Sequence, residues 1–321
     1  LVALQAGHLI DFFRAGARAL RDRIARALPF WPADLPGRSC LVGMHAFGLE
    51  ETGDYARAEE AGRAAVEAEP RDAWAHHAVA HVMEMQGRPE DGLGWMAARE
   101  PHWTGDDAFF QVHNWWHLAL CHLELGDGAG ALALYDGPVR GGRSPFAVNL
   151  VDASALLWRI ALAGVAVGDR WEELAAAWDA HADGRLYPWN DWHAAMAYLG
   201  AGRAPEAERL RAAWAAAEGP ETARWGREIA VPLIEGFAAF ARGDHATAAD
   251  RLMPARAIAN AFGGSHAQRD VIGLTLTEAA IRGRLGGLAA ALAAERLALR
   301  PHSPLNRGFR ARAVTCATPS A

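Results

Sequence analysis

The sequence has few cysteines, no long apolar run and no strong excess of charge, and each absence narrows what the protein can be. Cys40, Cys121 and Cys316 are far apart and odd in number. They argue against a disulfide framework or a cysteine zinc site and suit a reducing, cytoplasmic setting. No run of about 18 apolar residues is present, so we expect no membrane span. A net charge of −6 gives no general attraction for nucleic acid or an anionic membrane.

Strand signals are nearly absent as well. No stretch alternates valine, isoleucine or threonine with polar residues over the length of a strand. Alanine, leucine, arginine and glutamate dominate instead, and these residues favour helices. The sequence therefore predicts an all-α protein. Within it, 13 tryptophans and 14 histidines stand out against four tyrosines, and most of the histidines lie within helical pattern.

A unit of about 34 residues recurs along the chain and has the marks of the tetratricopeptide helical hairpin. Glycine ends the first helix of a unit, a small residue lets the second helix pack closely on it, and proline stops the second helix. The turn glycines fall at Gly53, Gly87, Gly126, Gly202 and Gly243. About eight hairpins are expected, over residues 2–28, 39–70, 73–104, 112–140, 150–182, 188–217, 224–258 and 268–300.

These hairpins predict one right-handed α-solenoid with a concave polar groove. Each hairpin covers the apolar face of the next, so the stack shares a continuous core. We assign residues 1–302 to this single domain. Residues 303–321 are rich in Arg, Ser and Pro, and we expect them to form a disordered tail.

Histidine pairs at helical spacing are the strongest functional signal. His77 and His81 are four residues apart, as are His113 and His117, so each pair lies on one face of a helix. In tetratricopeptide stacks the first helix of each hairpin lines the concave surface. The repeat register puts both pairs on that surface, together with His193. We expect the five imidazoles to meet in the groove, where they are candidate acid–base catalysts.

Other side chains are expected to share the groove. Glu50 and Glu84 are placed to orient an imidazole, and Trp115, Trp116 and Trp192 would form an apolar wall. Asparagine, aspartate and arginine side chains would supply hydrogen bonds or clamp a carboxylate. The candidate ligand-binding residues are Glu50, Glu84, Asn114, Trp115, Trp116, Asp152, Arg159, Asn190, Asp191 and Arg269.

Some of these assignments have a structural alternative. Arg269 would either reach into the groove for an acidic ligand or form a salt bridge near Asp270 or Glu278. Asp152 and Arg159 are seven residues apart on one helix face and are similarly ambiguous. For these residues the sequence leaves a binding role and a packing role open.

Six segments resemble one known family, the tetratricopeptide repeat protein 38 family, also called StaR-like. They are Met44–Thr52, Pro70–Trp74, His81–Arg88, His113–His117, Asn190–His193 and Gly263–Val271. The resemblance extends over nearly the whole chain and implies an all-helical solenoid, some members lying in antibiotic biosynthesis clusters. It implies no established reaction. Family members usually carry a longer amino-terminal portion, so the chain is expected to lack part of the family's fold. His45 and His266 depart from the family's pattern, and we assign neither a function.

Three interpretations of the groove histidines stay open. In the first, each imidazole is bonded to a carbonyl or carboxylate and helps to set the packing of the repeats. In the second, the groove binds an organic ligand, and the histidines transfer protons near neutral pH. In the third, His77, His81, His113 and His117 hold a transition metal such as zinc, iron or manganese. The His-Glu-x-x-His order of zinc proteases is absent.

The partner in the groove is predicted to be a small molecule or a peptide. Grooves that bind a peptide's carboxylate typically use lysine, arginine and asparagine. Histidine and tryptophan take their place here, which favours a small ligand. A binding protein and an enzyme that uses the same groove both remain open.

Overall fold

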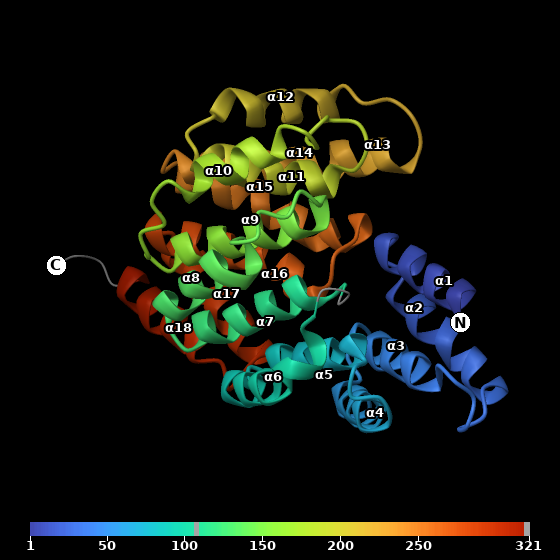
Figure 1. The fold of residues 1–321 in the computed structure, drawn as a ribbon. Coiled ribbons are helices and arrows are strands. Elements are labelled where there is room, and N and C mark those ends of the chain that lie inside the picture. The colour runs from blue at the N-terminus through green and yellow to red at the C-terminus, as the bar shows by residue number, and fades with distance from the viewer. Residues whose placement is uncertain (106–108, 318–321) are drawn as a thin grey trace.

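The computed structural model describes residues 1–105 and 109–317, and helices account for nearly all of its regular structure (Figure 1). No strand occurs among these residues. The helices pair into the hairpins that the sequence predicts: α1 (Val2–Phe13) with α2 (Ala17–Ala27), α3 (Arg38–Glu50) with α4 (Tyr55–Ala68), α5 (Ala73–Met85) with α6 (Pro89–Trp103), α7 (Gln111–Glu124) with α8 (Gly128–Leu134), α9 (Ala147–Leu162) with α10 (Arg170–Trp178), α11 (Pro188–Gly200) with α12 (Ala204–Ala215), α14 (Val231–Ala241) with α15 (His245–Ile258), and α16 (His266–Arg282) with α17 (Gly286–Leu299). The prediction of an all-α solenoid of helical hairpins is confirmed.

Short irregular helices complete the hairpins. The π-helical turn Tyr135–Val139 extends α8, and α13 (Glu221–Trp225) leads into α14 through a second π-helical turn, Gly226–Ala230. Two 3₁₀ turns, Leu28–Phe30 and Ala259–Phe262, follow α2 and α15. In the described part of the chain, no helix is both long and apolar enough to cross a membrane.

The predicted turn and packing residues are in place. Gly87 has φ of +67°, a left-handed conformation that favours glycine, and a Cβ there would lie 2.9 Å from the backbone nitrogen of Ser303. Ala58, Ala207 and Ala289 are at most 1% exposed, because the two helices of each hairpin approach closely at these positions. The positions of glycine and alanine within each repeat therefore set the geometry of the hairpin.

The solenoid curls far enough for its last hairpin to return to its first half. Helix α16 packs against α9 and also against α5, far earlier in the sequence. Trp158 of α9 donates a hydrogen bond to the hydroxyl oxygen of Thr275 at 3.0 Å. The backbone N–H of His266 donates to Glu51 Oε1 at 3.0 Å, which joins the start of α16 to the end of α3. The concave surface is therefore enclosed by the chain's own last repeat.

The chain continues beyond the predicted solenoid as a further packed helix. Residues Pro304–Ala317 form α18, which lies against α17. Two side chains of α18 itself, Phe309 and Ala313, are buried. Arg296 donates to Asn306 Oδ1 at 2.8 Å, which fixes the beginning of α18. The prediction of a disordered tail is wrong for these residues, because apolar side chains four positions apart give α18 one face to bury. Residues 318–321 of that predicted tail lie outside the described residues.

Candidate functional site

Four imidazoles from two neighbouring helices meet inside the enclosed solenoid. His77 and His81 lie on α5, and His113 and His117 lie on α7. One ring nitrogen from each histidine lies within 4.8 Å of those of the other three. His77, His81 and His117 are at most 3% exposed, and the side chain of His113 is 14% exposed. We call these four residues the histidine cluster.

Each of the two imidazoles of α7 contacts a carboxylate. Nδ1 of His113 lies 2.9 Å from Asp152 Oδ2 of α9, and Nδ1 of His117 lies 2.9 Å from Glu84 Oε2 of α5. An ionised carboxylate only accepts hydrogen bonds, so each contact places the ring proton on Nδ1 and leaves Nε2 as the ligand atom. This arrangement of carboxylate and histidine is the one that orients histidines at metal sites.

A third carboxylate faces His81. Glu50 is fully buried, and its Oε2 lies 3.4 Å from Nδ1 of His81. One oxygen each of Glu50 and Glu51 and one ring nitrogen of His266 also lie within 4.8 Å of one another. Glu51 is already bonded to the backbone N–H of His266, and the guanidinium of Arg269 lies 3.8 Å from its other oxygen. This group joins the histidine cluster to α16.

Burial favours the neutral form of the groups in this region. Desolvation lowers the pKa of His81 to about 4, and it lowers the pKa values of His77 and His117 well below the usual value for histidine. The same cause raises the pKa of Glu84 and raises that of Glu50 well above its usual value. Neutral imidazole is the form that binds metal ions. A bound cation would stabilise the ionised carboxylates beside it.

Several buried polar atoms near the cluster have no hydrogen-bond partner among residues 1–105 and 109–317. They are both ring nitrogens of His77 and of His81, Nε2 of His117, both carboxylate oxygens of Glu50 and the side-chain amide of Asn114. Leaving one buried polar group without a partner costs about 1–3 kcal/mol. Because most buried polar groups have a partner, this concentration of unpartnered atoms makes the interior around the cluster a candidate binding site.

Trp116 covers one side of the cluster. Its indole stacks on the ring of His113, with the two planes 11° apart and the centroids separated by 5.1 Å. Arg159 lies over the same indole and donates to the backbone oxygen of Ala267 at 2.8 Å. Asp152 bonds His113 while Arg159 bonds the first turn of α16. The two residues therefore do not form the carboxylate clamp that the sequence suggested.

An aromatic cavity of about 320 Å³ adjoins the cluster on the side of His77 and His113. Helices from both halves of the solenoid build it, because α1, α3, α5 and α7 face α11 and the segment before α16. Its aromatic walls include Phe12, Phe47, Trp74, Phe110, Tyr187 and Trp189. We use the name aromatic cavity for this space. Its position makes the two histidines accessible to a small molecule.

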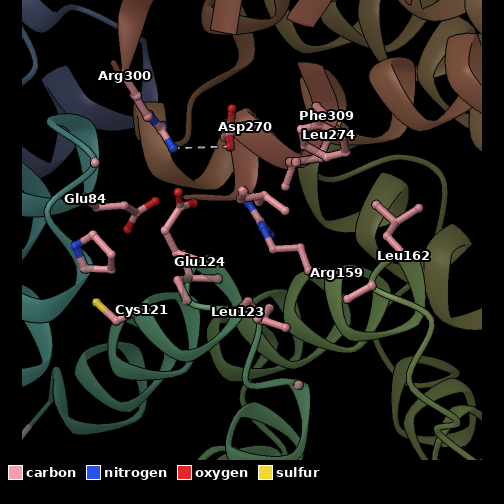
Figure 2. A pocket seen from close by; sticks show the side chains of 18 of the residues that line it. Glu84, Cys121, Leu123, Glu124, Arg159, Leu162, Asp270, Leu274, Arg300 and Phe309 are labelled. Carbon is pink, nitrogen blue, oxygen red and sulfur yellow. Dashed lines mark hydrogen bonds and ion pairs between the residues drawn. The ribbon is translucent and has the colours of Figure 1, made fainter. Parts of the chain in front are cut away.

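A charged cavity of about 330 Å³ lies on the other side, behind Glu84. Figure 2 shows Glu84, Glu124 and Arg159 pointing toward the space beside Asp270 and Arg300. Arg300 lies 3.5 Å from Asp270, whose pKa is lowered by the neighbouring arginines despite its burial. Glu84 contacts His117 and also lines this second cavity. It therefore links the histidine cluster to the charged cavity, on the side opposite the aromatic cavity.

His193 does not join the other histidines. Its Nδ1 donates to the backbone oxygen of Trp189 at 2.8 Å, and its ring packs against Trp189 and Trp192. The cluster of ring nitrogens does not include it. The repeat register placed His193 on the correct helix face, but α11 lies two hairpins beyond α7, and α9 separates them. The expected meeting of all five imidazoles is corrected to four.

Three other candidates have packing roles. Asp191 Oδ2 accepts a hydrogen bond from Trp214 at 2.8 Å and so joins α11 to α12. Trp115 packs edge-to-face on Trp103 in the core between α6 and α7, with ring centroids 4.9 Å apart. Trp192 is fully buried in the core. These residues do not line either cavity next to the cluster.

The remaining candidates lie close to the site. Asn190 lines the aromatic cavity. Arg269 donates to the backbone oxygen of Gly263 at 3.3 Å and lies near Glu51, so it holds the segment before α16. This arrangement differs from the alternative salt bridge to Asp270 or Glu278.

The sequence did not single out most of the cavity walls. Trp74 was not among the candidate ligand-binding residues, and Tyr187 precedes a helix and belongs to no repeat motif. His266, to which no function was assigned, lies beside Glu50 and Glu51. The capping box formed by Ser265 and Gln268 fixes where α16 begins, and it was the one local signal available for this segment.

No protein-family model matches this sequence. The fold is similar to the crystal structure of the APC/C hetero-tetramer Cut9–Hcn1, with 14% sequence identity and a TM-score of 0.47 over 97% of this chain. The chain spans 55% of that longer chain. It is also similar to a tetratricopeptide repeat protein from Parabacteroides merdae, with 12% identity, a TM-score of 0.42, and coverage of 85% of this chain and 98% of that one.

Proposed function

We propose that this protein binds one transition-metal ion through His77, His81, His113 and His117 and presents it to a small molecule in the aromatic cavity. The observation that carries the proposal is the histidine cluster, four buried imidazoles with one nitrogen each within 4.8 Å of the others. Packing requirements do not explain why four such rings share one interior position.

The residues suit a metal such as zinc or iron, which imidazole nitrogen binds well. Tetrahedral zinc with bonds of about 2.0–2.1 Å needs nitrogens about 3.3 Å apart. The nitrogens now lie up to 4.8 Å apart, so binding of zinc would draw them together by up to about 1.5 Å. Asp152, Glu84 and Glu50 lie behind three of the rings. A bound divalent ion would favour their ionised forms, whose negative charge would then balance its own.

His77 differs from the other three ligands. Among the described residues no carboxylate oxygen pairs with its ring, whereas His81, His113 and His117 each face one. His77 also lines the aromatic cavity. His77 is therefore the ligand that a bound molecule would displace most easily, which would leave the three oriented histidines and an open position, as in catalytic zinc sites. A metal in that position polarises a carbonyl or lowers the pKa of a bound water.

Metal-free acid–base chemistry by the same residues is the second candidate. It is favoured by the raised pKa of Glu84, whose Oε2 lies 2.9 Å from Nδ1 of His117. An extended peptide is a weaker candidate for the ligand, because the enclosed cavity of about 320 Å³ suits a small molecule.

The deciding experiment is elemental analysis of the purified protein before and after chelation and reconstitution with zinc, ferrous iron or manganese. We expect about one equivalent of one metal, and we expect the double variant His113→Gln, His117→Gln to lose it. The control is His122→Gln, His181→Gln, which removes two histidines outside the cluster. Metal content below about a tenth of an equivalent in the folded, reconstituted parent protein would overturn the metal site and leave the acid–base alternative.

A further inference from the structure

The lining of the aromatic cavity has an unusual balance of charge. No arginine lines it within the described residues, and the sequence contains no lysine. Among the described lining residues Asp152 is the one carboxylate, and it is bonded to His113. His8, which also lines the cavity, is fully buried, and desolvation lowers its pKa to about 4, so it is neutral at pH 7. In the metal-free protein an anionic ligand would therefore meet a carboxylate and no arginine among the described residues.

The walls match a flat ring. Trp74 and Phe110 meet edge-to-face with centroids 4.3 Å apart, and Trp189 continues the aromatic surface from the opposite half of the solenoid. Aromatic rings interact with one another through edge-to-face and offset contacts, in addition to the apolar area they bury. The size of the cavity, about 320 Å³, is at the lower end for small-molecule sites, which suits a compact ring system.

The side-chain amide of Asn190 is a polar group in the lining that remains available to a ligand. The half-buried amide of Asn190 makes no side-chain hydrogen bond in the part of the chain that the structure describes. By contrast, Asn149 donates to Ser144 at 2.8 Å, and Gln268 accepts a hydrogen bond from the backbone N–H of Ser265 at 3.0 Å. Asn190 can both donate and accept, so it fits a hydroxyl or a carbonyl group.

We infer that the aromatic cavity binds an uncharged aromatic molecule that carries a hydroxyl or carbonyl group, with the ring among Trp74, Phe110 and Trp189 and the polar group at Asn190. This inference names the ligand class for the proposed function. The cavity lining that supports it does not depend on a bound metal.

The test uses 2-naphthol as the probe, with naphthalene and 2-naphthoate for comparison, and measures dissociation constants by titration calorimetry on the full chain. Both the chelated and the metal-loaded protein are titrated. We expect 2-naphthol to bind the chelated protein at least about tenfold more tightly than 2-naphthoate does, because the anion has no counter-charge in the cavity.

Two variants locate the binding. Asn190→Leu is expected to weaken 2-naphthol about fivefold to tenfold and to leave naphthalene unchanged, because one hydrogen bond is lost. Val148→Trp places a large side chain at a position that is 52% exposed and lines the cavity, and it is expected to abolish binding of both probes. Its control is Leu299→Trp, at a position 70% exposed on α17 that lines neither cavity.

The outcomes separate the two proposals. Binding of 2-naphthol without any metal uptake would support the cavity and refute the metal site. Metal uptake without probe binding would support the metal site and refute the inferred ligand of the aromatic cavity. Equal binding of 2-naphthoate to the chelated protein, or unchanged binding in Val148→Trp, would overturn the inferred ligand class or its location.

Discussion

Replacing Asp152 with asparagine tests whether a carboxylate prepares the histidine cluster for a metal. Asp152 is 1% exposed, and its Oδ2 lies 2.9 Å from Nδ1 of His113. The substitution keeps the size of the side chain and removes its charge. Removing a carboxylate behind a metal-binding histidine typically costs 10–100-fold in metal affinity, or about 1.4–2.7 kcal/mol. We expect a loss in that range for zinc.

The assay is competition between the protein and a chromophoric chelator at constant pH. Asp127→Asn is the matched control, because Asp127 lies 2.8 Å from Nδ1 of His122 in an aspartate–histidine pair outside the cluster. The same titration in a His113→Gln background separates direct from indirect effects. If Asp152 acts through the ring, its substitution costs little once His113 is gone. An equal loss of affinity in both backgrounds would refute the reasoning.

Three further predictions concern stability and are measured by urea unfolding. Burial lowers the pKa of His81 to about 4, so the unfolded chain binds more protons than the folded protein between pH 6.5 and 4. The contribution of His81 to stability therefore falls as the pH falls, and the parent should lose about 1.6 kcal/mol relative to His81→Gln between pH 6.5 and 5. A constant difference between the two proteins would contradict this. Phe309→Ala should cost about 3–5 kcal/mol if α18 is an integral part of the core, whereas Phe146→Ala, at a position 68% exposed, should cost under about 0.5 kcal/mol. Gly87→Ala should destabilise the protein more than Gly202→Ala. Both glycines have positive φ, but only at Gly87 would a Cβ meet another segment, the backbone of Ser303 just before α18. Equal losses of unfolding free energy in the two variants would mean that Ser303 does not pack against Gly87.

Local sequence patterns were sufficient for the hairpins. Helix α5 begins at Ala73 and α11 at Pro188, both as predicted, because the turn glycines and the small packing residues act within one repeat. The pairing of His77 and His81 with His113 and His117 was also accessible, since it needs only helical spacing and the adjacency of two repeats.

Contacts between distant repeats were not accessible in the same way. The register of His193 gave the face on which it lies but not its distance from α7 along the superhelix. The aromatic cavity depends on where α1 and α11 face each other, and Tyr187 has no periodic signal that would reveal this. The curvature of a solenoid sums small rotations over many repeats, so a sequence motif within one repeat does not determine it.

The return of α16 onto the first half of the chain also has a consequence for the order of events during synthesis. About 150 residues separate His117 from His266, so at typical translation rates the histidine pairs leave the ribosome roughly ten seconds or more before the helix that covers them. During that interval the proposed metal site on α5 and α7 would be open to solvent. An ion bound at that stage would be surrounded by protein when the last repeat docks, and the aromatic cavity beside His77 and His113 would then be its route of exchange.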